Sequence, residues 1–297
     1  MPASSKKKKI VVSIPAYNEE KTLGQIIQSI KNVMRGYNYE VQVIDDGSVD
    51  RTVEIARKSG AKVISHPKNY GLAQAFNTEL DAAIENGADI VVHIDADGQY
   101  LAEEIPKLLH EIDKGSDLVL GSRFLGKIES MPLINRLGNM AFSSVISQII
   151  GQRITDAQTG FRAFTREVAK RVKITSTYTY THEQLIRSER EKFKIAEVPV
   201  TARKTRKSRL MRSPFDYAIK AWINILRLYR DYEPLKFFGM IGGSLFAAGF
   251  VIGIFIIATL METGTVGGIP RVILSALLIL TGIQIITLGF LADMNRK

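Results

Sequence analysis

The stretch VVHIDADGQY, residues 91–100, ends an apolar run with two carboxylates, Asp95 and Asp97. Burying one carboxylate costs free energy, and two neighbouring carboxylates repel each other. We therefore expect the folded protein to compensate these charges. If the strand continues, Asp95, Asp97 and Gln99 face the same side, with only small residues between them.

Oxygen ligands on one face suit Mg²⁺ or Mn²⁺, which keeps open coordination positions for the phosphate oxygens of a substrate. Such a cation would offset both carboxylates. The alternative is a turn that carries two solvated aspartates, because an isolated Asp-x-Asp pattern has low specificity.

Short β-rich runs alternate with helical stretches on both sides of this motif. The runs are nearly continuous in apolar residues, as expected for strands that helices cover on both faces. The pattern predicts an α/β fold with a mostly parallel, Rossmann-like sheet. Strands are expected at 9–15, 39–45, 61–65, 89–95 and 116–122, and helices within 20–34, 49–60, 71–87 and 103–115.

Polar clusters follow four of these strands, and ligands bind at the carboxyl ends of the strands in open α/β sheets. A carboxylate of the second cluster can accept a hydrogen bond from a ribose hydroxyl or a base N–H group. Alternatively, Ser48 or Asp50 caps the next helix. The clusters are PAYNEE (15–20), DDGSVD (45–50), DADGQ (95–99) and GSRF (121–124).

The C-terminal quarter has a different composition from the rest of the chain. Uncharged runs of 24 and 21 residues, Phe237–Leu260 and Val272–Ala292, are long enough to span a bilayer. The alternative is a buried hairpin of core helices. The loop between the runs, METGTVGGIP, has no Lys or Arg, whereas the flanks are basic, so both termini are predicted in the cytosol.

The chain carries a net charge of +10, and six basic residues fall in the window RKTRKSRLMR, residues 203–212. Because this window precedes the apolar runs, it favours anionic lipid headgroups or a phosphate-bearing substrate over nucleic acid. The absence of Cys excludes disulfides and thiolate metal sites. No two of the four histidines have a zinc-like spacing, so they are read as structural.

Two stretches have the character of interfacial helices. Residues 132–151 have apolar side chains at helical spacing, and residues 213–235 combine aromatic and basic side chains. Ordinary domain helices are the alternative. The predicted organisation is a cytosolic domain (1–212, with an interfacial helix at about 132–151), a juxtamembrane amphipathic helix (213–235) and a two-span transmembrane hairpin (236–297).

Taken together, these motifs resemble the family 2 glycosyltransferases with the GT-A fold. IPAYNEE, VIDDGSVDRT, HIDADGQY, LGSRF and DAQTGFRAF occur in the order typical of that family, followed by THEQLI and EVPV. With interfacial helices and C-terminal spans, the chain is similar to the polyprenyl-phosphate glycosyltransferases of the dolichol-phosphate mannose synthase type. Trp222 is the only Trp, so the chain lacks the QxxRW motif of processive polysaccharide synthases.

The resemblance implies roles for residues on both substrates. Asp97, Arg123 and Glu183 would be the catalytic group, with Glu183 acting as a base or orienting a sugar hydroxyl. The nucleotide sugar would contact Pro15, Ala16, Tyr17, Glu19, Asp46 and Asp95, with Arg203 and Arg209 over its phosphates. The metal ligands would be Asp95, Asp97 and Gln99, and Arg123 and Arg136 would bind the acceptor phosphate.

The predicted reaction is inverting transfer of one sugar from a GDP- or UDP-sugar to dolichyl or polyprenyl phosphate at the cytosolic face of the membrane. It would depend on Mg²⁺ or Mn²⁺ and supply lipid-linked sugar for glycan assembly. The alternatives are a glycosyltransferase that acts on a lipid-diphosphate-linked or other glycan acceptor and a non-catalytic membrane scaffold. The sequence does not decide which sugar is transferred (mannose, glucose or N-acetylglucosamine) or which polyprenol accepts it. It also does not decide whether the chain self-associates, although glycine-rich spans favour self-association in the membrane.

Overall fold

The structure is a computed structural model that describes residues 8–175, 180–204, 223, 225–227, 229–266 and 268–294. The chain divides into two compact units, Met1–Pro214 and Phe215–Lys297. The strands are β1 (Lys9–Ala16), β2 (Asn38–Asp45), β3 (Lys62–Ser65), β4 (Ile90–His93), β5 (Leu118–Ile128), β6 (Arg162–Thr165) and β7 (Ile195–Ala202). The helices are α1 (Leu23–Val33), α2 (Thr52–Lys58), α3 (Leu72–Glu85), η1 (Ala102–Glu104), α4 (Ile105–Asp113), α5 (Leu133–Ile150), α6 (Arg166–Arg171), α7 (Thr181–Arg190), α9 (Pro234–Thr263) and α10 (Ile269–Met294).

Within the described residues the first unit forms a seven-stranded sheet of order β3-β2-β1-β4-β6-β5-β7. Strands β1, β2, β3 and β4 are parallel, and β5 is parallel to β7. Strand β6 lies between β4 and β5 and runs antiparallel to both. The predicted mostly parallel α/β sheet is confirmed.

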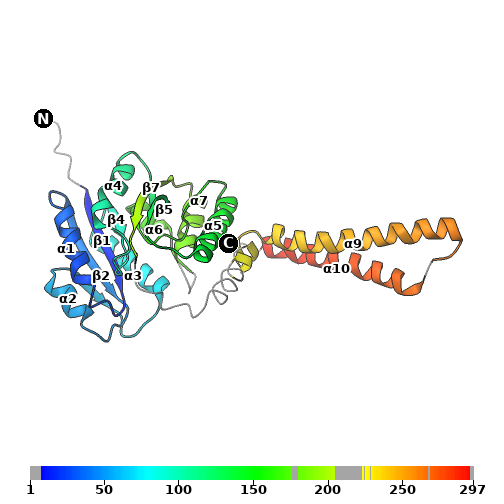
Figure 1. Cartoon of the computed structure of the whole chain (residues 1–297), viewed down its shortest axis with the longest axis horizontal. Helices are drawn as coiled ribbons and strands as arrows, with labels where there is room; N and C mark the ends of the chain where they lie inside the picture. The colour runs from blue at the N-terminus through cyan, green and yellow to red at the C-terminus, as the bar shows by residue number, and fades with distance from the viewer. Residues whose placement is uncertain are drawn as a thin grey trace. The chain divides into compact units, whose positions relative to one another are not determined.

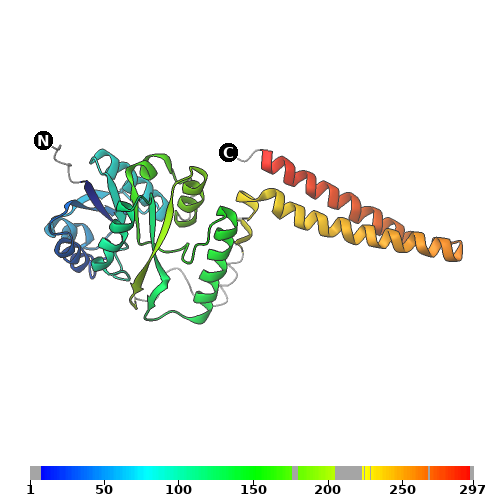
Figure 2. The ribbon, with the colours of Figure 1, turned by 90° about the horizontal axis from the view of Figure 1, so that it is seen from above.

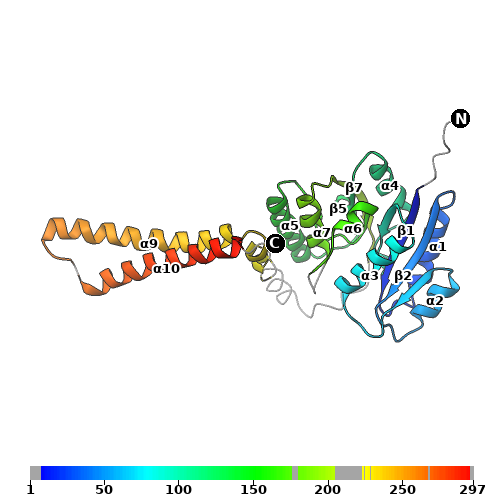
Figure 3. The ribbon, with the colours of Figure 1, turned by 180° about the vertical axis from the view of Figure 1, so that it is seen from behind.

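The sheet is covered on both faces, which explains why its strands are continuously apolar. Helices α1 and α4 bury Ile27, Ile30 and Leu108 against one face, and α3 buries Phe76 against the other (Figure 1). Helices α5 and α7 lie side by side, as Figure 3 shows from behind. This layering leaves the carboxyl ends of β1, β2 and β4 next to one another.

Two predictions about strand length are wrong. Strand β4 ends at His93 rather than at Asp95, because a turn follows at once. Strand β5 runs to Ile128, beyond the predicted end at residue 122, so Arg123 lies within it and not after it. The pairing of β5 with β7 shifts register between Ser122 and Lys127, and β5 stays paired with β7 as far as Ile128.

The second unit contains α9 and α10, which pack against each other as an antiparallel pair (Figure 2). A Cβ atom on Gly242 would lie 2.6 Å from the carbonyl oxygen of Gly282, so glycine permits the close approach of the two helices. Only 6 % of the most apolar stretch of α9 and 17 % of that of α10 is buried. Core helices of a soluble domain are mostly buried, so both helices are candidate membrane spans.

Candidate active site

Asp95, Asp97 and Gln99 lie on a tight turn after β4, not on an extended strand. Gly98 has a φ of 75°, which favours glycine, and the Gln99 N–H donates to Asp97 Oδ1 at 2.9 Å. The premise of a continuing strand is therefore wrong. The turn still holds the three side chains at the carboxyl edge of the sheet, each of them partly exposed.

Asp95 is packed between two neighbours. A Cβ atom on Gly160 would lie 2.3 Å from Asp95 Oδ2, so the carboxylate occupies space that only glycine leaves open. On the other side, Asp95 Oδ1 lies 3.7 Å from His93 Nε2. Because 31 % of its side chain remains exposed, Asp95 is oriented by the protein yet accessible from solvent.

The donor set of this turn fits a hard divalent cation. Among the described residues, no three His, Asp or Glu side chains cluster as a complete metal site. Two carboxylates and one amide are oxygen donors that leave several coordination positions open. Mg²⁺ and Mn²⁺ fill such positions with water and substrate phosphates, so the residues present fit that kind of cation.

Hydrogen bonds join the loops after β1 and β2. Asn18, at a left-handed φ of 55°, donates its N–H to Ser48 Oγ at 2.9 Å and accepts from the Val49 N–H at 2.9 Å. The Thr22 hydroxyl donates to the Ala96 carbonyl at 2.6 Å, which ties the first loop to the turn after β4. The predicted convergence of these clusters at one edge is confirmed.

The residues predicted for the nucleotide lie at this edge. Pro15 and Ala16 end β1, Tyr17 is 40 % exposed, and the buried Glu19 donates its N–H to Thr52 Oγ1 at 2.8 Å. The prediction that Ser48 or Asp50 is the N-cap of α2 is wrong, because the N-cap residue is Arg51. Asp50 accepts a hydrogen bond from the Thr52 N–H at 3.0 Å.

Asp46 holds the loop that leads into α3. Its two carboxylate oxygens accept from the Tyr70 and Gly71 N–H groups, both at 2.9 Å, and Oδ1 lies 2.7 Å from His66 Nδ1. Only 5 % of Asp46 is exposed. Asp46 therefore shapes the wall of this end of the site.

Arg123 forms a buried ion pair with Asp156. Its Nε and Nη2 donate to the two oxygens of Asp156 at 2.7 and 2.8 Å, and its own N–H donates to Oδ2 at 3.0 Å. Asp156 is fully buried and Arg123 is 8 % exposed. This bidentate geometry anchors the 155–157 loop and fixes the direction of the guanidinium.

The other predicted phosphate ligands lie in different surroundings. Arg203 is exposed, and its N–H donates to the Gln99 carbonyl at 2.9 Å, so its main chain lies beside the acidic turn. Arg136 is exposed on the first turn of α5. The same helix exposes apolar side chains, namely Leu133, Ile134, Leu137 and Met140. Arg209, most of the basic window and residues 213–222, 224 and 228 lie outside the described residues.

Glu183 is 1 % exposed in the first turn of α7. Its Oε1 accepts from the Thr175 N–H and hydroxyl at 2.9 and 2.7 Å, and from Arg187 Nε at 2.7 Å. The predicted catalytic carboxylate thus also holds residue 175 against α7.

The sequence reading missed a buried polar network behind Asp95. His93 Nδ1 lies 2.7 Å from Glu79 Oε2, and His93 Nε2 lies 2.8 Å from the Tyr180 hydroxyl. Burial alone would lower the pKa of His93, but the Glu79 and Asp95 carboxylates outweigh it and raise the pKa to about 9. The signal available in the sequence was a Glu within the apolar stripe of α3, three residues after Phe76.

Arg162 is a second missed group, because it is fully buried on β6 beside His93. It donates to the carbonyls of Ala157, Thr159 and Thr181 and to Gln184 Oε1 at 2.7–3.0 Å. These bonds tie the segment around Gly160 to the start of α7.

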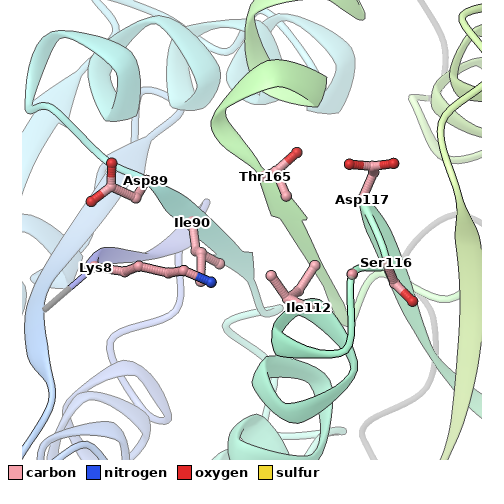
Figure 4. Close-up of a pocket in the computed structure, with 8 residues that line it drawn as sticks. Lys8, Asp89, Ile90, Ile112, Ser116, Asp117 and Thr165 are labelled. Atoms are coloured by element: carbon pink, nitrogen blue, oxygen red, sulfur yellow. The ribbon is translucent and has the colours of Figure 1, made fainter. Parts of the chain in front are cut away.

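A surface pocket of about 250 Å³ lies at the other edge of the sheet, where β4 and β5 begin. Figure 4 shows Lys8, Asp89, Asp117 and Thr165 around it. Because the polar clusters lie at the carboxyl ends of the strands, this pocket is separate from the candidate site.

Comparisons with known proteins point in one direction. A family model described as "Glycosyl transferase family 2" matches residues 11–173. A dolichyl-phosphate hexose transferase of Haloferax volcanii is 38 % identical over 196 residues, which are 65 % of this chain and 82 % of that protein. The glycosyltransferase AglJ of the same organism is 28 % identical over 288 residues, 96 % of this chain and 93 % of that protein.

Among solved structures, the first unit is similar to glucosyl-3-phosphoglycerate synthase from Mycobacterium tuberculosis, crystallised with Mn²⁺, UDP and phosphoglyceric acid. The identity is 25 % and the TM-score 0.61, over 75 % of this chain and 78 % of that one. The sheet described above is thus that of a GT-A fold.

Proposed function

Because the chain belongs to glycosyltransferase family 2, we propose that it transfers one sugar from a nucleotide sugar to a polyprenyl phosphate at the cytosolic face of a membrane. Membership of this family makes the chain a glycosyltransferase. The observation that supports the proposal most directly is the acidic turn at residues 95–99 in a chain that also carries two candidate membrane spans. The name of the Haloferax transferase supports a dolichyl phosphate as the acceptor.

The bound cation would neutralise charge on the leaving nucleoside diphosphate. Asp95, Asp97 and Gln99 would hold it, and Arg203 would lie over the donor phosphates, with Arg209 as a further candidate. Pro15, Ala16, Tyr17 and Glu19 would line the nucleotide pocket, whose wall Asp46 shapes. Every one of these residues that the structure describes lies at or beside the carboxyl edge of the sheet.

The acceptor phosphate needs position more than it needs a base. A phosphate monoester has a second pKa near ~6, so at neutral pH it is already mostly a dianion. Arg123, held in direction by Asp156, would present its guanidinium to this phosphate, and Arg136 would do so from the exposed face of α5. An acceptor oxygen would then bond to the anomeric carbon while the bond to the diphosphate oxygen breaks.

Direct displacement predicts inversion at the anomeric carbon. Glu183 would orient a sugar hydroxyl rather than abstract a proton, because it is buried and already hydrogen-bonded. The basic flanks of the spans support a cytosolic location of the catalytic domain and of both termini. Self-association in the membrane remains a prediction.

A panel of donors tests this function. The purified full chain is incubated with Mn²⁺, a polyprenyl phosphate and, in turn, labelled GDP-mannose, UDP-glucose and UDP-N-acetylglucosamine. We expect one donor to yield organic-soluble label that EDTA and Asp97→Asn abolish. Asp113→Asn is the matched control, because Asp113 ends α4 and pairs with Lys8 on the surface.

The possible outcomes separate the alternatives. If nucleotide binds but no donor yields lipid label, the acceptor is not a polyprenyl phosphate and the roles of Arg123 and Arg136 are wrong. If no nucleotide binds in the presence of Mn²⁺, the proposed transfer is wrong and the alternative of a non-catalytic scaffold is favoured.

A further inference from the structure

Glu79 and His93 form a buried ion pair in the core of the first unit. Both side chains are 0 % exposed, and His93 Nδ1 lies 2.7 Å from Glu79 Oε2. A carboxylate only accepts hydrogen bonds, so Nδ1 must carry the hydrogen and donate it to Glu79. The imidazole is therefore held by α3 in a defined orientation on the last residue of β4.

Burying this ion pair in a protein core costs free energy. Desolvating a charged pair costs several kcal/mol, and apolar side chains of similar volume often replace such pairs without loss of stability. Aromatic side chains pack beside the pair: Phe76 lies one helical turn from Glu79 and stacks on Tyr180 at a centroid distance of 4.0 Å. Packing alone therefore does not account for a Glu and a His here.

The second ring nitrogen of His93 points toward the acidic turn. Asp95 follows His93 by two residues and lies in the turn after β4. Nε2 lies 2.8 Å from the Tyr180 hydroxyl and 3.7 Å from Asp95 Oδ1. Gly160 closes the opposite side of the Asp95 carboxylate.

We propose that Glu79 and His93 are positioning residues that orient the Asp95 carboxylate for the divalent cation and diphosphate of the donor. The inference rests on the proposed function. Glu79 orients the imidazole through Nδ1, and the imidazole limits the positions of Asp95 through Nε2. Groups behind metal ligands typically change metal affinity by about 10–100-fold when they are removed.

Metal affinity is the direct readout of this role. Mn²⁺ binding to the purified full chain is measured by electron paramagnetic resonance with saturating UDP and then GDP. We expect Glu79→Leu and His93→Leu each to weaken Mn²⁺ binding by about 10–100-fold. Their double variant is expected to be scarcely weaker than either single variant, because both act through one contact.

Conservative variants and a stability control separate positioning from general damage. Glu79→Gln keeps an acceptor for Nδ1, and His93→Gln keeps an amide N–H near the position of Nε2, so both should retain most of the affinity. Leu108→Ala removes a fully buried side chain of α4 on the other face of the sheet, so it should lower stability but leave Mn²⁺ affinity unchanged.

A second measurement needs no destabilising variant. In the ¹⁵N-histidine-labelled wild-type protein, addition of Mg²⁺ and UDP or GDP is expected to shift the His93 Nε2 resonance but not that of His110, which is exposed on α4. Assignment uses the His→Gln variants.

Three results would overturn the inference. One is a folded His93→Leu variant with wild-type Mn²⁺ affinity. Another is a Leu108→Ala variant that loses as much affinity as the leucine variants. The third is a His93 resonance that does not respond to metal and nucleotide. A wild-type protein that binds no Mn²⁺ with either nucleotide contradicts the proposed function itself.

Discussion

Asp95 and Gly160 lie in direct contact: a Cβ atom on Gly160 would come within 2.3 Å of Asp95 Oδ2 and 2.8 Å of its Cγ. Residue 160 lies just before β6, and Asp95 lies just after β4, the strand that pairs with β6. The position of the candidate metal ligand thus depends on a residue 65 positions later in the chain that has no functional group.

Gly160→Ala should displace the Asp95 carboxylate, because the new methyl group occupies its place. We expect weaker Mn²⁺ binding and about 10–100-fold lower sugar transfer at limiting Mn²⁺, with partial recovery at high Mn²⁺. The check is a Mn²⁺ titration of activity. The control is Gly243→Ala, at a glycine of α9 that has open space around it and no left-handed φ. Equal Mn²⁺ curves for Gly160→Ala and wild type would contradict this prediction.

Arg123→Ala should destabilise the first unit, since it leaves the carboxylate of Asp156 buried without its charged partner. Breaking a buried pair on one side typically costs about 3–5 kcal/mol of unfolding free energy. Urea unfolding of the first unit, followed by tyrosine fluorescence and circular dichroism, measures this loss. Arg35→Ala is the matched control, because Arg35 is exposed and pairs only with Asn32 among the described residues.

The activity of Arg123→Ala is informative only without denaturant and at a temperature at which the variant is folded. Under that condition the proposed role predicts a higher KM for polyprenyl phosphate. An unfolding free energy equal to that of wild type would mean that the ion pair contributes nothing to stability.

Arg136→Ala should weaken acceptor binding without affecting stability, because Arg136 is exposed on α5. A hydrogen bond to a charged group contributes about 1.5–3 kcal/mol, so the KM for polyprenyl phosphate should rise by about 10–100-fold. The KM for the nucleotide sugar should stay the same. Arg57→Ala, an exposed arginine of α2, controls for the loss of one surface charge. A rise in the donor KM instead would place Arg136 at the other substrate.

His182 makes stability depend on pH. Burial lowers the pKa of His182, Glu183 partly offsets this and Arg162 adds to it, so that the pKa falls from 6.5 to about 4. Between these pH values the unfolded chain binds a proton that the folded protein does not bind. The contribution of His182 to stability is therefore complete above about pH 6.5 and is lost as the pH drops toward 4, by about 3 kcal/mol at most.

Unfolding free energies from pH 7.5 to 4.5 test this dependence. His182→Gln should flatten the profile over that range, whereas His110→Gln, at an exposed position, should not. A profile for His182→Gln that is parallel to wild type would show that another group carries the dependence.

Much of the site could be predicted because its parts are local. The predicted strands 9–15, 39–45 and 61–65 differ from the observed ones by a residue at an end, since continuous apolar runs between polar clusters are a signal within the run itself. Strand β6 was not predicted, because four residues carry no periodicity and are recruited only by pairing with β4 and β5.

The sequence by itself determined the class of fold, the edge of the sheet where the polar clusters gather and the two apolar helices, because each depends on the order and spacing of nearby residues. Only the tertiary structure decided the partners of the charged side chains. Asp156 forms an ion pair with Arg123, and Glu79 forms one with His93. Gly160 leaves space for the carboxylate of Asp95. Each of these contacts joins residues 14 to 65 positions apart, and burial makes them specific, because a desolvated charge must be paired wherever the fold places it.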